Sequence, residues 1–178
     1  MGRVQPLPDA QVTTAARLEL DKQLAAHGRV TNMKRTLAHS PVALRALMTW
    51  YELREEVIPF LGERRTNLFA HAVSSQTDCL ICSTFFRRIL SDAGENPDLL
   101  DLDEVEQALV GYGRQLARDA NRVDDELFAQ LSAQFSAARL VTLTVFGGLM
   151  IATNVFNNAL QVDLDDYLQP YRKPGQRS

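Results

Sequence analysis

The chain has 178 residues, of which 46% are hydrophobic and 23% charged, which is typical of a globular domain with its own core. Its formal net charge is -3 and its basic residues are scattered, which argues against a nucleic-acid-binding protein. The N-terminal residues contain no apolar run, so we expect no signal peptide and a cytoplasmic location.

The first half of the chain predicts helices separated by clear breaks. Residues 9–26 mix apolar and charged positions as an amphipathic helix does. Ser40 and Pro41 form a helix start, with serine as N-cap and proline at the first helical position. Gly62 ends that helix, and residues 63–75 form the next one.

The second half continues the helical pattern. A helix that contains both cysteines is expected to be capped by Thr77 or Asp78. Beyond it the sequence predicts a loop at 94–97, a helix over 103–120, a short helix capped by Asp124 and a long helix from Ser136 to near Asn158. No segment alternates like a strand, so we predict an all-α fold in a single domain over residues 1–178, with a flexible tail from about residue 171.

The stretch 140–156 carries no charge and tests the possibility of a membrane span. Its threonine, glycine and asparagine residues dilute its hydrophobicity, so a core or subunit-interface helix is the better interpretation and we expect no membrane partner. Gly147 and Gly148 would let another helix approach closely.

The only two cysteines, Cys79 and Cys82, are three residues apart. On a helix their sulfurs would lie on one side within about one turn, which suits a dithiol that closes to a disulfide and reopens. A zinc site would need about four ligands, and His27, His39 and His71 show no partner spacing, so we predict no metal. The remaining alternatives are a redox dithiol and a pair of buried, inert cysteines.

Helical spacing places the cysteines on an apolar stripe with Phe86, so they should pack inward or line a cavity. On the preceding helix, Glu63, Asn67 and His71 follow one another at intervals of four residues and share a stripe. That stripe is either a solvated polar face or a face toward the thiols. In the second case His71 could relay protons.

Three segments of the chain resemble the carboxymuconolactone decarboxylase-like superfamily, specifically its AhpD-like (alkylhydroperoxidase) branch. The resemblance covers nearly the whole chain. It is carried by residues 30–44, by residues 64–82 with the Cys-x-x-Cys, and by residues 154–165.

The resemblance implies an all-α fold that assembles as a homo-oligomer, usually a trimer or hexamer. It also implies a thiol-dependent peroxidase without cofactor, in which Cys82 attacks a small hydroperoxide and Cys79 resolves the product to a disulfide. A lipoyl or other dithiol partner would reduce that disulfide again.

The chain departs from the family pattern around the thiols. Asn67 stands at the position of the family's glutamate, Phe86 at that of its histidine, and Ile81 between the cysteines, where histidine is frequent. A shifted proton relay through Glu63 or His71 is the hypothesis that keeps peroxidase activity. The main alternative is a redox-sensing, binding or structural oligomer with degenerate chemistry, and a lyase or isomerase acting on a small organic acid is a minor one.

Overall fold

The computed structural model describes residues 2–175, and this part of the chain forms helices and no strand. The all-α prediction is therefore confirmed. The α-helices are α1 (Thr14–His27), α2 (Asn32–Leu37), α3 (Pro41–Leu61), α4 (Glu63–Gln76), α5 (Leu80–Asp92), α6 (Glu104–Asp119), α7 (Asp125–Gln134) and α8 (Ala137–Leu160). Three 3-10 helices accompany them, η1 (Asp9–Gln11), η2 (Ala120–Arg122) and η3 (Asp166–Tyr171).

Side-chain caps set most of the helix starts, as the sequence predicted. Ser40, Asp124 and Ser136 each accept a hydrogen bond from a backbone N–H in the first turn of their helix. The predicted start of the first helix at residue 9 is wrong. Thr13 caps α1, and the residues before it form the separate turn η1.

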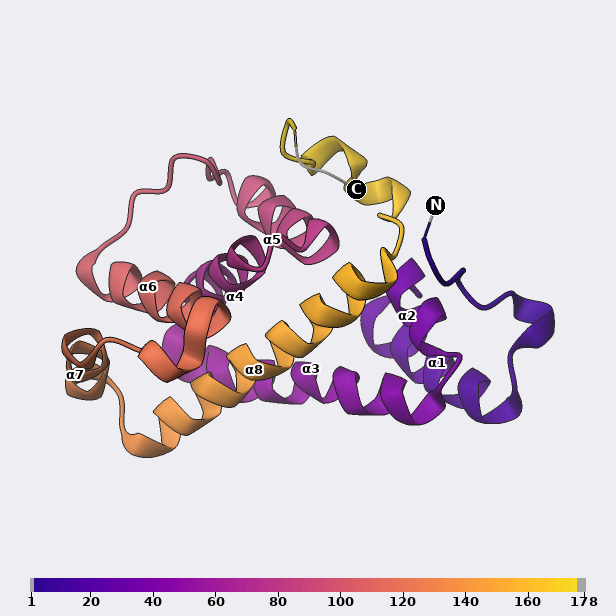
Figure 1. The fold of residues 1–178 in the computed structure, drawn as a ribbon, viewed down its shortest axis with the longest axis horizontal. Helices are drawn as coiled ribbons and strands as arrows, with labels where there is room; N and C mark the ends of the chain where they lie inside the picture. The colour runs from indigo at the N-terminus through magenta and orange to yellow at the C-terminus, as the bar shows by residue number, and fades with distance from the viewer. Residues whose placement is uncertain (1, 176–178) are drawn as a thin grey trace.

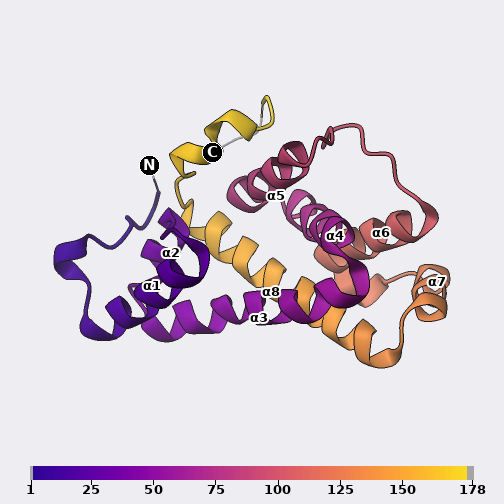
Figure 2. The ribbon, with the colours of Figure 1, turned by 180° about the vertical axis from the view of Figure 1, so that it is seen from behind.

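Helices α3 and α8 are the two long elements, and they cross in the middle of the molecule (Figure 1). Helices α4, α5 and α6 gather on one side of that crossing, whereas α1 and α2 lie at the other end of α3 (Figure 2 shows the same grouping from behind). The main core runs through α3, α4, α5, α6 and α8, with Phe69 and Phe146 fully buried at its centre.

The paired glycines of α8 have different surroundings. A Cβ on Gly147 would lie 3.0 Å from Phe69 Cζ and 3.2 Å from Leu116 Cδ1, so the close approach predicted for this position is confirmed. Gly148 is exposed, and a Cβ there would meet nothing within 4 Å. Only Gly147 is therefore needed for packing.

By length and composition α8 could cross a membrane, with a mean hydropathy of 1.5 in its most apolar window, of which 44% is buried inside the fold. It packs against α3, α4 and α6, as a core helix does. Val141 and Val145 remain exposed on its outer side.

After α8 the chain returns along α5. The Tyr171 hydroxyl donates to Asp92 at 2.8 Å, and Arg87 Nε donates to the Tyr171 carbonyl at 3.3 Å, so η3 is fastened to α5. The end of the expected flexible tail, residues 176–178, lies outside the described residues.

Candidate dithiol site

A sharp turn joins α4 to α5 and positions the first cysteine. Asp78 has a φ of 51°, in the left-handed region that aspartate tolerates better than most residues. Cys79 is itself the N-cap of α5, and its N–H donates to the Ser74 carbonyl at 3.0 Å. The predicted cap at Thr77 or Asp78 is therefore wrong by one or two residues, because the left-handed Asp78 delays the helix.

Both cysteines are free thiols beneath the surface. Cys79 is 0% exposed and Cys82 is 5% exposed. The side-chain amide of Asn157 donates to Cys82 Sγ at 3.3 Å and to Cys79 Sγ at 3.9 Å, and also lies 3.4 Å from Met33 Sδ. Asn157 Oδ1 is buried and has no hydrogen-bond partner among the described residues. The side-chain NH₂ group of Asn157 therefore contacts only sulfur atoms, which suits a role in the protonation of the two thiols.

Neighbouring asparagines of α8 hold the turn that carries Cys79. Asn154 Nδ2 donates to Thr77 Oγ1 at 2.8 Å, and Asn158 Nδ2 donates to the Thr77 carbonyl at 2.8 Å. Together with Asn157 they follow the spacing of one helix face. The long apolar helix therefore fixes both the backbone and the sulfurs of the Cys-x-x-Cys segment.

The thiols affect each other's protonation. The pKa of Cys79 is lowered, chiefly by a hydrogen bond from the Cys82 thiol and further by backbone N–H groups at the start of α5 and by Asn157, although burial opposes this. The pKa of Cys82 is raised well above its usual value by the hydrogen bond that it gives to Cys79, by burial and by the charge on Cys79. The first proton to leave the pair therefore leaves a thiolate at Cys79.

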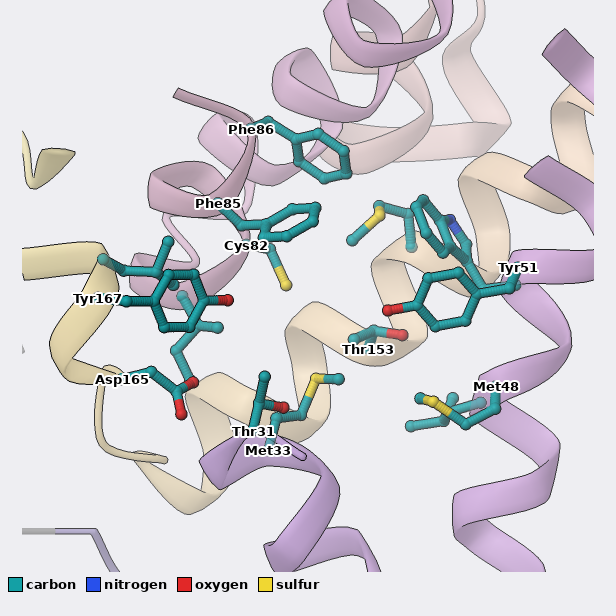
Figure 3. A pocket seen from close by; sticks show the side chains of 15 residues that line it. Thr31, Met33, Met48, Tyr51, Cys82, Phe85, Phe86, Thr153, Asp165 and Tyr167 are labelled. Atoms are coloured by element: carbon teal, nitrogen blue, oxygen red, sulfur yellow. The ribbon is translucent and has the colours of Figure 1, made fainter. Parts of the chain in front are cut away.

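A cavity of about 80 Å³ lies against Cys82, and Cys79 is not among its lining residues. Figure 3 shows the Cys82 sulfur pointing into this space. Most of the wall is apolar or aromatic and includes Met33, Met48, Trp50, Phe85, Phe86 and Met150. The expectation that the cysteine stripe lines a cavity is thus confirmed for Cys82.

A few polar groups interrupt this wall. The hydroxyl ends of Tyr51 and Tyr167 point into the cavity from opposite sides (Figure 3). Asp165 is the one carboxyl group among the lining residues. Arg29 stacks on the Tyr167 ring at 3.9 Å, and His27 stacks on the Tyr51 ring at 3.8 Å.

The two residues of the expected shifted relay lie elsewhere. Glu63 is an exposed first-turn residue of α4, and its carboxylate pairs with Arg54 at 2.5 Å. His71 lines a different cavity with Asp78, Ser83 and Arg87, and its Nε2 lies 3.3 Å from Ser75 Oγ. Neither residue lines the cavity at Cys82.

The side chain of Asn67, between them on α4, is buried, and its Oδ1 has no partner among the described residues. Ile81 and Phe86, the other positions that depart from the family pattern, both line the cavity and give it apolar wall. Within residues 2–175 no group of three or more His, Cys, Asp or Glu side chains could hold a metal ion.

Sequence reasoning missed Asn157 and Asp165 as members of the site. Both lie in the segment 154–165 that carried part of the family resemblance. The signal for Asn157 was a run of asparagines at helical spacing in an otherwise apolar helix. Asp165 follows the end of α8 and gave no such signal, because only the return of the chain along α5 brings it to the cavity.

Comparison with known proteins gives a consistent fold. No protein-family model matches the sequence, and no curated protein gives a significant match. A solved alkylhydroperoxidase AhpD core, an uncharacterized peroxidase-related protein from Ralstonia eutropha JMP134, aligns with a TM-score of 0.72 at 18% identity, covering 94% of each chain. An uncharacterized peroxidase-related protein from Silicibacter sp. TM1040 aligns with a TM-score of 0.68 at 18% identity, covering 96% of this chain and 93% of that one.

The debrominase Bmp8 in its apo form also has this fold, with a TM-score of 0.75, 16% identity, and 94% of this chain and 95% of that chain covered. At these identities the likeness concerns the fold. The chain therefore has the all-α AhpD-like fold that its sequence resemblance implied, and its Cys-x-x-Cys pair lies inside that fold.

Proposed function

We propose that this protein is a thiol-dependent peroxidase that reduces an organic hydroperoxide with Cys82 and Cys79. The observation that carries the proposal is the position of the Cys82 sulfur at the wall of an apolar cavity, with the fully buried Cys79 thiol behind it. Cys82 can therefore contact a substrate in the cavity, and Cys79 can afterwards form the disulfide with the oxidised Cys82.

The reaction begins with the proton that the two thiols exchange. Cys82 donates a hydrogen bond to Cys79, so transfer of this proton leaves the thiolate, which is the reactive form, at Cys82. The Cys82 sulfur attacks the terminal oxygen of the hydroperoxide, the O–O bond breaks, and Cys82 becomes a sulfenic acid. The Cys79 thiol then attacks that sulfur and releases water, so that one hydroperoxide and two thiols give one alcohol, one water and one disulfide.

The test is a thiol count after the fully reduced protein has met a limiting amount of tert-butyl hydroperoxide. We expect both thiols to disappear together. In Cys79→Ser, dimedone should trap a sulfenic acid at Cys82. In Cys82→Ser the remaining thiol should survive, because Cys79 does not reach the cavity. Unchanged thiols in excess hydroperoxide would instead support a binding or structural role.

The proposed reductant is a dihydrolipoyl group or another dithiol. The proposed location is the cytoplasm, where the reducing conditions would keep both cysteines as free thiols. Steady hydroperoxide turnover with dihydrolipoamide, and a much lower rate with a monothiol at equal thiol concentration, would support this. Equal rates with both would contradict a dedicated dithiol partner.

A second candidate is suggested by the aromatic wall of the cavity and the fold shared with a debrominase. An organic bromide and two thiols can give the debrominated compound, hydrogen bromide and a disulfide, so the same pair could supply the electrons. Release of bromide from a brominated aromatic compound, in step with loss of both thiols, would favour this substrate over a hydroperoxide.

We also propose a homo-oligomer, a trimer or hexamer, assembled through the outer face of α8. Val141 and Val145 are 63% and 49% exposed there, beside Phe128, which is 42% exposed. Light scattering should give a multiple of the 19.9 kDa chain mass, and Val145→Glu should reduce it. A monomer at micromolar concentration would contradict the proposal.

A further inference from the structure

The cavity at Cys82 contains few groups that could move a proton. Its titratable lining residues are Tyr51, Cys82, Asp165 and Tyr167. Burial raises the pKa of Tyr51 to about 12 and also raises the pKa of Tyr167, so at neutral pH both phenols stay protonated. Among the lining groups other than the thiol, Asp165 carries the single carboxyl, a type of group that commonly serves as a general acid in proteins.

The two oxygens of Asp165 have different environments. Oδ1 accepts the backbone N–H of Asn32 at 2.9 Å, which anchors the carboxyl group to the start of α2. Oδ2 is buried and has no hydrogen-bond partner among the described residues. A buried, unpaired carboxylate oxygen is costly, and a protonated carboxyl or a bound substrate hydroxyl would remove that cost.

Charged groups around Asp165 come from three segments. Burial is the largest cause and raises the pKa of Asp165. Arg29, before α2, lowers this pKa, whereas Asp166 on η3 raises it, and the net shift is upward. Lys34 on α2 is itself buried, with its pKa lowered to about 8 mainly by burial. Asp165 is therefore protonated more readily than an ordinary surface aspartate.

We propose that Asp165 is the general acid of the dithiol site and protonates the alkoxide that leaves when Cys82 breaks the O–O bond. This inference rests on the proposed peroxidase function. The family resemblance assigned proton transfer to positions 67 and 86. In this proposal a carboxyl on a different segment performs that transfer. Asn67, which cannot donate as an acid, and Phe86 would then need no replacement on their own helices.

The Cys82 proton passes to the Cys79 thiolate, the Cys82 sulfur bonds to the terminal oxygen, and the O–O bond breaks. The alkoxide takes the proton of Asp165 and leaves as the alcohol. Disulfide formation releases water, and Asp165 regains a proton from solvent.

Two reagents with different leaving groups test the proposal. Attack on iodoacetamide releases iodide, which needs no proton, whereas attack on tert-butyl hydroperoxide releases an alkoxide, which does. The rates of both reactions at Cys82 are compared in Cys79→Ser with and without Asp165→Asn. General acid catalysis typically contributes about 10²–10⁴-fold, so sulfenic acid formation should slow by roughly 10²-fold or more in Asp165→Asn.

Alkylation should stay nearly equal, because a neutral Asp165 carboxyl and the asparagine amide that replaces it carry the same charge, and iodide leaves without a proton. Asp165→Glu should recover part of the hydroperoxide rate. Asp21→Asn is the matched control, since it removes an exposed carboxylate of α1 that lies outside the cavity and should leave the hydroperoxide rate within about twofold.

Several outcomes would overturn the proposal. Equal slowing of both reactions would assign Asp165 a structural role, equal acceleration would assign it only a charge effect, and no change would place it outside the chemistry. Failure of the protein with intact Asp165 to react with hydroperoxide, while alkylation proceeds, would contradict the peroxidase function itself and is therefore distinguishable.

Discussion

The side-chain amide of Asn157 donates to Cys82 Sγ at 3.3 Å and to Cys79 Sγ at 3.9 Å, so one polar group of α8 serves both sulfurs. Its contribution lowers the pKa of each thiol. Because both sulfurs are buried, this donor has little competition from water.

Replacing Asn157 with leucine should therefore make the thiols less acidic. A hydrogen bond to a charged group is worth about 1.5–3 kcal/mol, which corresponds to roughly one to two pKa units. We expect the apparent pKa of the pair, followed by thiolate absorbance against pH, to rise by about one unit or more. Asn158→Leu, which removes the neighbouring amide from the Thr77 carbonyl but not from sulfur, should leave it nearly unchanged.

The adjacent glycines of α8 give a stability test with opposite signs. Gly147→Ala forces a Cβ against Phe69 and Leu116, and such overpacking costs about 1–3 kcal/mol. Gly148→Ala meets nothing within 4 Å and should stabilise the helix by about 0.5–1 kcal/mol. Urea unfolding measures both, and equal effects would show that the close contact at Gly147 is relieved in solution.

Arg64 is expected to matter for stability because it pairs with a buried carboxylate. It contacts Glu106, whose side chain is 7% exposed, and also Glu95 at 2.8 Å. Breaking a buried ion pair typically costs about 3–5 kcal/mol. The cost should be lower here, because Arg64 is partly exposed and Arg65 makes a second contact with Glu106 at 3.7 Å. We therefore expect Arg64→Met to lower the free energy of unfolding by about 2 kcal/mol.

Arg54→Met is the matched control for that substitution. It removes the same type of side chain from the exposed carboxylate of Glu63, and surface pairs contribute about 0–1 kcal/mol. A comparable loss in free energy of unfolding for both variants would contradict the importance of the buried Glu106.

His71 should make stability sensitive to acid without contributing to thiol chemistry. Burial, with nearby Arg87, lowers its pKa from 6.5 to about 4, so the folded protein keeps this imidazole neutral where the unfolded chain protonates it. The associated stability is present above pH 6.5 and is lost as the pH falls toward about 4, by up to about 3 kcal/mol.

His71→Gln should reduce the difference in unfolding free energy between pH 7 and pH 4.5. The rate of thiol loss with hydroperoxide at pH 7 should be unchanged, because His71 lines a cavity other than the one at Cys82. A large fall in that rate would restore the shifted relay through His71.

Local signals in the sequence predicted the fold well. The caps at Ser40, Asp124 and Ser136 satisfy backbone groups within a few residues, so their effect can be read directly from the sequence. Helical spacing likewise placed Cys82 and Phe86 on one stripe, and both line the cavity.

Which residues form the site depends on long-range packing, so local signals in the sequence could not predict it. His71 has the expected spacing on α4 but faces a cavity on the other side of α5, because helical periodicity fixes a stripe and not the neighbour that the stripe meets. Asn157 and Asp165 reach the thiol region from more than seventy residues away in the chain, through the packing of α8 and the segment after it.

The complete burial of Cys79 also affects how an oxidised site would be recovered. An incoming thiolate could attack only the Cys82 sulfur of a disulfide, since Cys79 has no exposed surface. Cys79 would then be the departing sulfur, and its lowered pKa makes it a good leaving group. The same N–H groups at the start of α5 that favour its thiolate would thus speed reduction and direct the mixed disulfide to Cys82.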